Sequence, residues 1–331
     1  MQTFTKQLNP IRWGIIGCGN VTEVKSGPAY QQTEGFELVA VMRRNLDKAK
    51  DYAERHKVPK FYNDANSLIN SSEVDAVYIA TPPDSHLDYA LQVAREGKPC
   101  CIEKPMARSY QECLQIYNAF DSAGIPLFIA YYRRTLPRFR KVKEWLDSGK
   151  IGTVRHLNWV LSQPPSALDL SQVPNWRTDA KVAPGGYFDD LASHGLDLFE
   201  FLLGEFKEAS GCSLNQQGLY SAVDAVAASW IHKSGVTGSA CWNFGSFQNE
   251  DKVEIFGSSG KITFSIFQDG PLVWETKMGR EEVSIAHPQT IQLPHVQEMK
   301  KALFENDYIH PSTGATGLHT SWVMDKILGK I

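Results

Sequence analysis

The sequence predicts an α/β protein of two domains, the first with a parallel, doubly wound sheet and the second with a largely antiparallel sheet. Up to about residue 130, apolar strand segments alternate with helical segments, which is the pattern of parallel βαβ units. From Thr153 onward, strand-like alternation recurs between glycine and polar turns, as in antiparallel sheets. The length of 331 residues and the hydrophobic content of 42% suffice for two cores.

The first strand, at residues 11–16, leads into the glycine loop Gly17-Cys18-Gly19-Asn20-Val21, and a segment that can begin a helix follows. A strand that feeds a helix through glycines brings backbone N–H groups and the helix N-terminus against a pyrophosphate. Thr22 stands where the fingerprint has a third small residue. The alternative is an ordinary strand-to-helix turn whose glycines supply a positive φ. In its favoured interpretation, the loop predicts a Rossmann dinucleotide-binding domain.

The other elements follow in chain order. In the first half we expect strands at 37–41, 76–80, 99–102 and 126–130, helices at 46–56 and 85–96, and a closing helix at 139–147. In the second half we expect strands at 156–161, 224–232, 236–244, 252–256 and 261–267. A C-terminal helix over 312–331 is expected to pack back onto the first domain. The domain boundaries are therefore placed at 1–130, 131–311 and 312–331.

The end of the second strand carries Arg43 and Arg44, about 20 residues beyond the glycine loop, where such folds bind the adenosine ribose. An acidic side chain there accepts bonds from a free 2′-hydroxyl, whereas arginine suits a 2′-phosphate. NADP is thus favoured over NAD, with NAD still possible. The alternative is that both arginines belong to a solvated strand end.

Two later strands also end in polar residues at the edge where such sheets bind ligands. After the third expected strand come Thr81 and Pro82, and His86 falls in the first turn of the next helix, where it could contact the cofactor or serve in packing or capping. The strand at 99–102 is followed by Glu103-Lys104-Pro105. Lys104 is a strong site candidate, and the alternative is a surface ion pair between neighbours.

A second polar group lies in the later half, where Gly185 and Gly186 precede a segment with Asp190, His194 and Asp197. On a helix these spacings of four and three put the three side chains on one face. A carboxylate one turn from an imidazole can orient it and raise its pKa, which equips His194 to exchange a proton with a hydroxyl or carbonyl group. The alternative is an exposed helical charge pair.

These motifs occur together in the order and spacing of one family. The motifs are the glycine loop, Thr81-Pro82 with His86, Glu103-Lys104-Pro105, Trp176-Arg177, Gly185-Gly186 and Asp190-x-x-x-His194. The chain resembles the glucose-fructose oxidoreductase, inositol dehydrogenase and MocA (Gfo/Idh/MocA) family of NAD(P)-dependent enzymes over nearly its whole length. It departs from the family pattern at Ala192, where glycine is frequent, and at Thr22.

The resemblance implies roles for single residues. Lys104 and His194 flank the reacting carbon, His194 exchanges the proton, and Asp190 binds substrate hydroxyls or orients the pair. The residues implied at the cofactor are Gly17, Cys18, Gly19, Asn20, Val21, Arg43, Arg44, Lys48, Thr81, Pro82, His86, Glu103, Lys104, Trp176 and Arg177. Those that suit a hydroxylated substrate are Tyr131, Tyr187 and Asp190. Lys48, one helical turn beyond the arginines, adds to a pattern that resembles NADP-preferring members.

Composition bounds the partners. A net charge of −3 and a pI near 6.3 argue against nucleic acid or an anionic membrane surface. No stretch approaches the roughly 20 apolar residues of a membrane span, and the start lacks the apolar run of a secretion signal, so we expect a cytoplasmic protein. The six cysteines show neither paired metal-ligand spacing nor the density of a disulfide scaffold, so neither a metal site nor a disulfide framework is indicated.

Three functions are open at this point. The first is a reversible NADP-dependent oxidoreductase of a small sugar or polyol. The second is a glycosidase that keeps the cofactor bound and uses transient oxidation and elimination, as a branch resembling this family does. The third is a non-catalytic cofactor-binding sensor. A homodimer or homotetramer is expected, because the antiparallel sheet can leave one face uncovered.

Overall fold

The computed structural model describes residues 10–171, 173 and 175–331. The chain divides into two compact units, one built from the residues up to Leu136 together with Pro288–Leu318, the other from Pro137–His287 and His319–Ile331. A parallel sheet in the first unit and a mostly antiparallel sheet in the second confirm the expected fold class. The boundaries differ from those expected, since residues 288–311 belong to the first unit and residues 319–331 to the second.

The first unit contains a six-stranded sheet in the order β3-β2-β1-β4-β5-β6, in which each described pair of neighbours is parallel. The strands are β1 (Ile11–Ile16), β2 (Phe36–Met42), β3 (Lys60–Tyr62), β4 (Ala76–Ile79), β5 (Cys100–Ile102) and β6 (Leu127–Ile129). The order reverses between β1 and β4, and ligands of such sheets bind outside the carboxyl ends of the strands at this switch point. The short strand β3 was not expected from the sequence, because it has three residues and none of them is buried.

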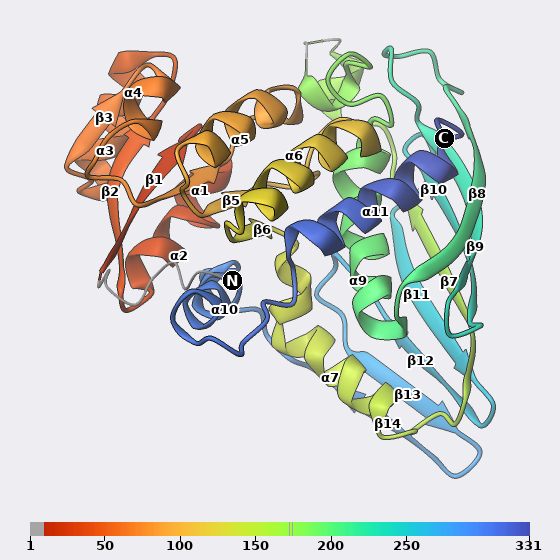
Figure 1. Cartoon of the computed structure of the whole chain (residues 1–331). Coiled ribbons are helices and arrows are strands. Elements are labelled where there is room, and N and C mark those ends of the chain that lie inside the picture. Colours follow the sequence, from red (N-terminus) through yellow and green to blue (C-terminus); the bar gives the residue numbers. More distant parts are fainter. Residues whose placement is uncertain (1–9, 172, 174) are drawn as a thin grey trace. The chain divides into compact units, whose positions relative to one another are not determined.

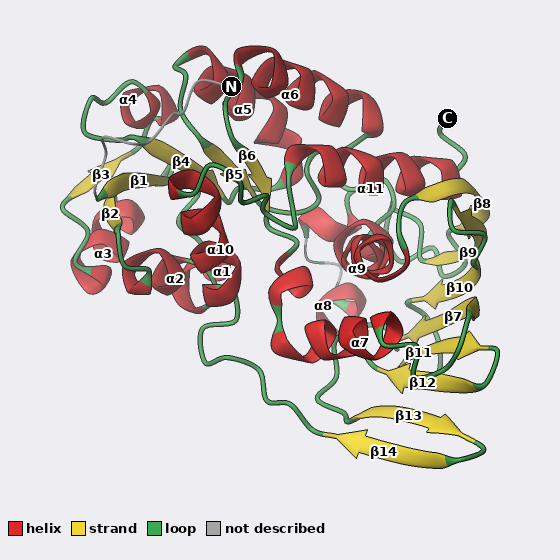
Figure 2. Ribbon diagram, turned by 60° about the horizontal axis from the view of Figure 1, so that its bottom comes forward, coloured by secondary structure: helices red, strands yellow, loops and turns green. Residues whose placement is uncertain are grey.

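Helices cover both faces of this sheet. They are α1 (Asn20–Val24), α2 (Gly27–Gln32), α3 (Leu46–His56), α4 (Ala65–Ile69), α5 (His86–Arg95), α6 (Tyr110–Ala123) and α10 (Leu293–Phe304), with short 3₁₀ turns at Pro83–Ser85 and Tyr132–Thr135. Figure 2 shows α4, α5 and α6 on one side of the sheet and α1, α2, α3 and α10 on the other. Each side has its own apolar cluster, one including Leu68, Val93 and Ile116, the other Tyr30 and Val296.

The segment Pro288–Leu318 joins the first unit through buried polar contacts and close backbone approach. Gln292 donates to the Glu103 carboxylate at 2.9 Å, and the Ser312 hydroxyl donates to the Ile129 carbonyl at 2.8 Å. A Cβ on Gly317, in the first turns of α11 (Gly314–Ile327), would lie 2.5 Å from the Ile129 side chain. The first turns of α11 therefore pack on β6, while its later turns belong to the second unit.

The second unit contains an eight-stranded sheet in the order β14-β13-β12-β11-β7-β10-β9-β8. The strands are β7 (Val154–Ser162), β8 (Phe206–Leu214), β9 (Ala225–His232), β10 (Thr237–Asn243), β11 (Glu250–Gly257), β12 (Gly260–Phe264), β13 (Leu272–Thr276) and β14 (Gly279–Val283). Among the described pairs, β7 and β10 run parallel and the others antiparallel. The sequence pattern did not reveal β8, β13 and β14, because most of their residues are not buried and they lack a clear apolar alternation.

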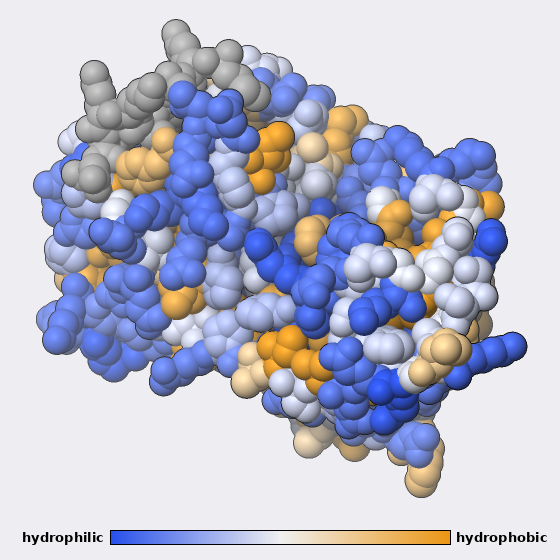
Figure 3. Space-filling view, turned by 90° about the horizontal axis from the view of Figure 1, so that it is seen from below, coloured by the Kyte–Doolittle hydropathy of each residue, from blue (hydrophilic) through white to orange (hydrophobic). Residues whose placement is uncertain are grey.

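The helices of the second unit are α7 (Pro137–Asp147), α8 (Ala167–Leu170) and α9 (Ser193–Leu203), with a 3₁₀ turn at Trp176–Thr178 and a π-helical segment at Phe188–Ala192. Figure 1 shows α7, α9 and the later turns of α11 along one face of the eight-stranded sheet. Within the described part of the chain, every helix is too short or too polar to cross a membrane. On the surface seen in Figure 3, hydrophilic residues predominate and hydrophobic residues form small separate patches.

Candidate active site

The glycine loop connects β1 to α1 at the switch point of the first sheet. Gly17 has a φ of +93°, and a Cβ there would lie 2.7 Å from the Thr81 methyl group and 2.9 Å from the backbone at the end of β4, so only glycine fits. The N–H groups of Gly17 and Cys18 both donate to the Met42 carbonyl, at 2.9 and 3.2 Å. The loop is therefore held against the end of β2 by these two amides.

The geometry of the loop fits the pyrophosphate of a dinucleotide. A Cβ on Gly19 would have one neighbour within 4 Å, the Gly17 carbonyl oxygen at 3.9 Å, so the space in front of Gly19 is open. Gly19 caps α1 without a side-chain hydrogen bond. The N–H groups of Asn20 and Val21, in the first turn of α1, have no acceptor within the helix and can bind an anion placed there. Because α1 has five residues, these N–H groups matter more than its dipole.

Thr22, the departure from the family's glycine pattern, is accommodated by hydrogen bonds. Its side chain is fully buried, and its hydroxyl donates to the Gly19 carbonyl at 2.8 Å. Its own carbonyl accepts from the Tyr52 hydroxyl at 2.9 Å. Thr22 thus braces the loop from inside α1 and leaves the open side of Gly19 free.

Of the three basic residues proposed for the ribose end of the cofactor, Arg43 reaches the loop. Its Nη1 donates to the Cys18 carbonyl at 3.3 Å, and it is half-buried. Arg44 and Lys48 are exposed at the start of α3, where the Asn45 side chain caps the helix by accepting from the Lys48 N–H. The Cys18 thiol is buried, and burial raises its pKa to about 11, so this cysteine is not a reactive thiolate.

His86 is an interior residue. Its ring has no exposed surface, with Nε2 at 2.8 Å from the Thr81 carbonyl and Nδ1 at 3.1 and 3.2 Å from the carbonyls of Pro105 and Met106. Desolvation by burial lowers its pKa. These contacts favour the packing role that the sequence left open, and contact with the cofactor stays a prediction. His86 joins the Thr81-Pro82 turn to the loop after β5.

Glu103 anchors the segment that carries Lys104. Its Oε1 accepts from the Tyr78 hydroxyl at 2.5 Å and from Gln292 at 2.9 Å, and its Oε2 accepts from the Lys104 N–H at 3.2 Å. The Glu103 side chain is buried, with 6% exposure. The carboxylate faces its own unit's interior, which makes it a support for Lys104 rather than a group on the ligand side.

In the second unit, Asp190 lies in the π-helical segment and forms a salt bridge with Arg177. The Arg177 Nε donates to Asp190 Oδ2 at 2.5 Å, and the guanidinium lies 4.4 Å from the ring centre of Trp176. Both Asp190 and His194 are more than nine-tenths buried. The π-helical turn was not foreseen in the sequence, and such turns occur frequently at functional sites.

The third member of the expected trio, Asp197, makes a contact between two helices. Asp197 is fully buried and accepts from the Thr320 hydroxyl of α11 at 3.4 Å. Its carboxylate therefore links α9 to α11, a contact that the spacing of residues along one helix could not predict.

The start of α9 is positioned by tight packing beside His194. A Cβ on the next residue, Gly195, would lie 2.3 Å from the Trp159 ring and 2.9 Å from the Ile266 side chain. The indole N–H of Trp159 donates to Asp251 at 3.1 Å. The absence of a side chain at Gly195 thus lets α9 approach β7 closely, and the approach places His194 at the first turn.

The loop of residues 265–270 is held by hydrogen bonds and places Phe267 beside the imidazole of His194. The two ring centres are 6.0 Å apart at an interplanar angle of 72°. Asp251 accepts from the Phe267 N–H at 2.5 Å. The buried Arg138 guanidinium donates to the carbonyls of Ser265, Gln268 and Gly270 at 3.1–3.2 Å. Sequence reasoning missed Phe267, Asp251 and Arg138, because their roles come from long-range contacts and no local motif marks them.

The aromatic residues proposed for the substrate lie in different surroundings. Tyr131, at the end of β6, is fully buried in the first unit's core. Tyr187 is half-buried, its hydroxyl donates to Asp169 at 2.8 Å, and its ring meets that of Tyr220 edge-on at 6.3 Å. Trp176 lines a pocket of about 590 Å³ in the second unit. Within the described ranges, no three His, Cys, Asp or Glu side chains are grouped to hold a metal ion.

Asp189 is expected to make the stability of the second unit depend on pH. Its carboxylate is buried and accepts from the Gly185 N–H at 2.7 Å, and desolvation raises its pKa to about 6 from 3.8. The folded state holds this proton more tightly than the unfolded state does. The free energy of unfolding is therefore highest below about pH 4 and decreases as the pH rises to about 6. Replacing Asp189 by Asn removes this dependence and adds about 3 kcal/mol to the free energy of unfolding at neutral pH relative to the parent.

Denaturant unfolding of both proteins at about pH 4 and about pH 7 checks this expectation. The substitution of the exposed Asp307 by Asn is the matched control. If the free-energy difference between D189N and the parent does not grow with pH, the carboxylate is not protonated in the folded state.

Two family models match the chain. Residues 11–131 match an oxidoreductase family with an NAD-binding Rossmann fold, and residues 139–263 match the Gfo/Idh/MocA C-terminal domain. The chain belongs to the Gfo/Idh/MocA oxidoreductase family. Oxidoreductase P35 of Formosa agariphila is 40% identical over 292 residues, which cover 87% of this chain and 89% of that protein. The family membership confirms the resemblance that the motifs indicated and shows that the protein is an oxidoreductase.

More distant members of the Gfo/Idh/MocA family carry more specific names. Myo-inositol 2-dehydrogenase of Thermotoga maritima is 27% identical over 259 residues, which cover 76% of this chain and 74% of that enzyme. A solved structure of levoglucosan dehydrogenase in complex with NADH and levoglucosan has a TM-score of 0.85 at 23% identity and covers 96% of each chain. This likeness shows that the two proteins share the fold.

Proposed function

We propose that this Gfo/Idh/MocA protein transfers a hydride between a nicotinamide cofactor and a carbon of a sugar or polyol that bears a hydroxyl or carbonyl group. The observation that carries the proposal is the arrangement at the start of α9, where a nearly buried Asp190 is held by Arg177 one turn before a nearly buried His194. Relatives named for inositol and levoglucosan support the substrate class.

His194 is the proposed general acid and base. In the oxidising direction its imidazole takes the proton of the substrate hydroxyl, and in the reducing direction it returns a proton to the carbonyl oxygen. Asp190, held in place by Arg177, is the proposed acceptor of hydrogen bonds from substrate hydroxyl groups. Phe267 packs on the ring of His194 and limits its motion.

Lys104 is the proposed electrostatic partner. Its ammonium group stabilises the negative charge that develops on the substrate oxygen when the hydroxyl loses its proton or the carbonyl carbon receives the hydride. Glu103 and His86 are proposed to position Lys104, because they form hydrogen bonds with the backbone of the loop that carries it. When bound at the glycine loop, the cofactor supplies or accepts the hydride, and the residues of this chain provide binding and orientation.

NADP is the proposed cofactor, with Arg43 as the main group that reads the 2′-phosphate. The support is the contact of Arg43 with the glycine loop and its cationic fork. We expect the double substitution Arg43→Ala with Arg44→Ala to weaken NADPH binding at least tenfold more than NADH binding, since a charge-assisted bond to phosphate contributes about 1.5–3 kcal/mol. Fluorescence titrations with both cofactors measure the ratio, and an equal loss for both contradicts the assignment.

A homodimer or homotetramer is the proposed assembly. The support is the second unit's sheet. Helices α7, α9 and α11 lie along one of its faces, so a second copy of the chain can cover the other face. Light scattering coupled to size-exclusion chromatography is expected to give at least twice the chain mass of 37.0 kDa. A monomer at assay concentration contradicts this expectation.

The function is tested by a titration followed by a substrate screen. The cofactor that binds more tightly is incubated with a panel of aldoses, ketoses and polyols, and turnover is followed by the absorbance of the reduced nicotinamide. Turnover of a sugar or polyol is the expected result. Release of an aglycone without net absorbance change identifies the glycosidase reaction instead, and tight cofactor binding with no turnover in either assay identifies a sensor.

A further inference from the structure

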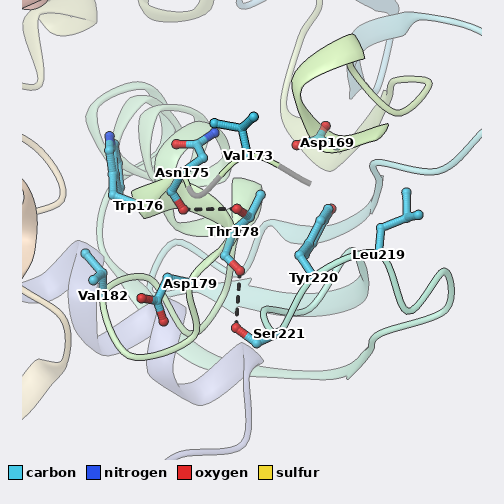
Figure 4. A pocket seen from close by; sticks show the side chains of 10 residues that line it. All are labelled: Asp169, Val173, Asn175, Trp176, Thr178, Asp179, Val182, Leu219, Tyr220 and Ser221. Carbon is cyan, nitrogen blue, oxygen red and sulfur yellow. Dashed lines mark hydrogen bonds between the residues drawn. The ribbon is translucent and has the colours of Figure 1, made fainter. Parts of the chain in front are cut away.

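The second unit contains an open pocket of about 590 Å³ next to the segment that carries Asp190. Its described lining residues come from α8, from the stretch around the 3₁₀ turn at Trp176–Thr178, and from the connection between β8 and β9. Figure 4 shows Trp176 and Tyr220 on its wall, together with Asp169, Asn175 and Ser221. The volume lies within the range of about 300–1,000 Å³ that small-molecule sites occupy. We call it the Trp176–Tyr220 pocket.

The chemistry of the pocket suits a hydroxylated ring. Trp176 and Tyr220 provide aromatic surface, and Asn175, Thr178 and Ser221 provide amide and hydroxyl groups. The Tyr220 hydroxyl oxygen is buried and has no hydrogen-bond partner among the described residues. A buried polar group without a partner is unfavourable, so this hydroxyl points to a partner that the bound ligand provides.

The charge of the pocket selects against anions. The described lining includes the carboxylates of Asp169 and Asp179 and no lysine or arginine. Asp169 already accepts hydrogen bonds from the Ser166 N–H and from the Tyr187 hydroxyl. A ligand with a carboxylate or phosphate would meet these negative charges along the described lining, whereas a neutral sugar ring would not be repelled by them.

Two short contact chains join the pocket to the catalytic segment of the same unit. Trp176 lies under the guanidinium of Arg177, which donates to Asp190. Tyr187, which precedes the π-helical segment, donates to Asp169 and packs on Tyr220. Hydrogen bonds and ring contacts thus connect the wall of the pocket to the segment that carries Asp190.

We propose that the Trp176–Tyr220 pocket is a subsite for a second, neutral sugar ring, so that the preferred substrate is a disaccharide or larger glycoside whose terminal ring reacts at His194. This inference rests on the proposed sugar oxidoreductase function and names its substrate class. The Tyr220 hydroxyl forms a hydrogen bond with the second ring, and the indole of Trp176 packs against the apolar face of that ring.

The test compares glucose with maltose, cellobiose and lactose, both as substrates and as ligands in calorimetric titrations of the protein with its cofactor bound. We expect at least one disaccharide to have a higher kcat/KM than glucose. The substitution Tyr220→Phe should lower the ratio of disaccharide to glucose kcat/KM about tenfold, because one hydrogen bond of about 1.4 kcal/mol is lost. The matched variant Tyr308→Phe, in the first unit, should leave that ratio unchanged.

The outcomes separate this inference from the proposed function. Turnover of glucose with no preference for disaccharides, or with a ratio unaffected by Tyr220→Phe, overturns the subsite and leaves the oxidoreductase function standing. Disaccharide binding that is weakened by Tyr220→Phe in a protein that turns over no sugar supports the subsite and refutes the function. Absence of disaccharide binding, or equal binding of cellobiose and its uronic acid derivative, overturns the proposal of a neutral second ring.

Discussion

Replacing His194 by alanine is expected to lower kcat about 10²–10⁴-fold while cofactor affinity persists, since this is the usual contribution of a general acid or base. The physical reason is that the variant lacks the imidazole that is proposed to take the hydroxyl proton. His194 is 4% exposed and lies in the second unit, whereas the glycine loop belongs to the first. The dissociation constant for NADPH should therefore change less than threefold. Steady-state kinetics and fluorescence titration measure both quantities.

The control for this variant is His156→Ala, which removes a half-buried histidine of β7 that forms a hydrogen bond with the Thr237 hydroxyl. It should retain parental kcat. His194→Gln distinguishes a chemical role from a packing role, because glutamine keeps a hydrogen-bonding side chain but cannot transfer the proton. If either His194 variant turns over at nearly the parental rate, the imidazole is not the acid and base.

Replacing Lys104 by methionine is expected to lower kcat about 10²–10³-fold, which is the usual loss when one donor that stabilises a developing charge is removed. Methionine keeps much of the side-chain volume, and the Lys104 N–H retains its bond to Glu103 because the backbone is unchanged. The fold and the melting temperature should therefore persist. Kinetics across pH supply a second readout, because loss of the ammonium group removes a positive charge from the site and should alter the pH dependence of kcat.

Lys277→Met, which neutralises an exposed lysine of the turn between β13 and β14, is the matched control for charge and side chain. Lys104→Arg adds a further comparison, since it keeps the charge with a different geometry. If Lys104→Met lowers the melting temperature as well as kcat, Lys104 supports the structure of its loop rather than the reaction.

Much of the candidate site could be located from the sequence, because its residues follow strand ends and helix starts with local signatures. The glycine loop lies between β1 and α1 as expected, and Glu103 and Lys104 follow β5 directly. What each side chain does there could not be predicted. His86 and Glu103 turn into the interior, and Arg177 binds Asp190, because these contacts depend on residues 13 to 189 positions away along the chain.

Helix boundaries illustrate what the sequence by itself determined. The helix α3 begins and ends where the sequence predicted, at Leu46 and His56, because the Asn45 cap and the left-handed Lys57 lie beside it in the chain. Such caps act over three or four residues, so the local sequence suffices to place them. The alternation of strands and helices in the first unit is determined in the same way.

Only the tertiary structure decided the contacts and the burial of the side chains that are proposed to react. The approach of Gly195 to Trp159, the presentation of Phe267 by Asp251 and Arg138, and the π-helical turn before His194 all arise from packing between elements distant in the sequence. Burial and long-range hydrogen bonds have no local signature, since they depend on how the elements fold together. The sequence therefore predicted which groups react, and the fold decided the surroundings of those groups.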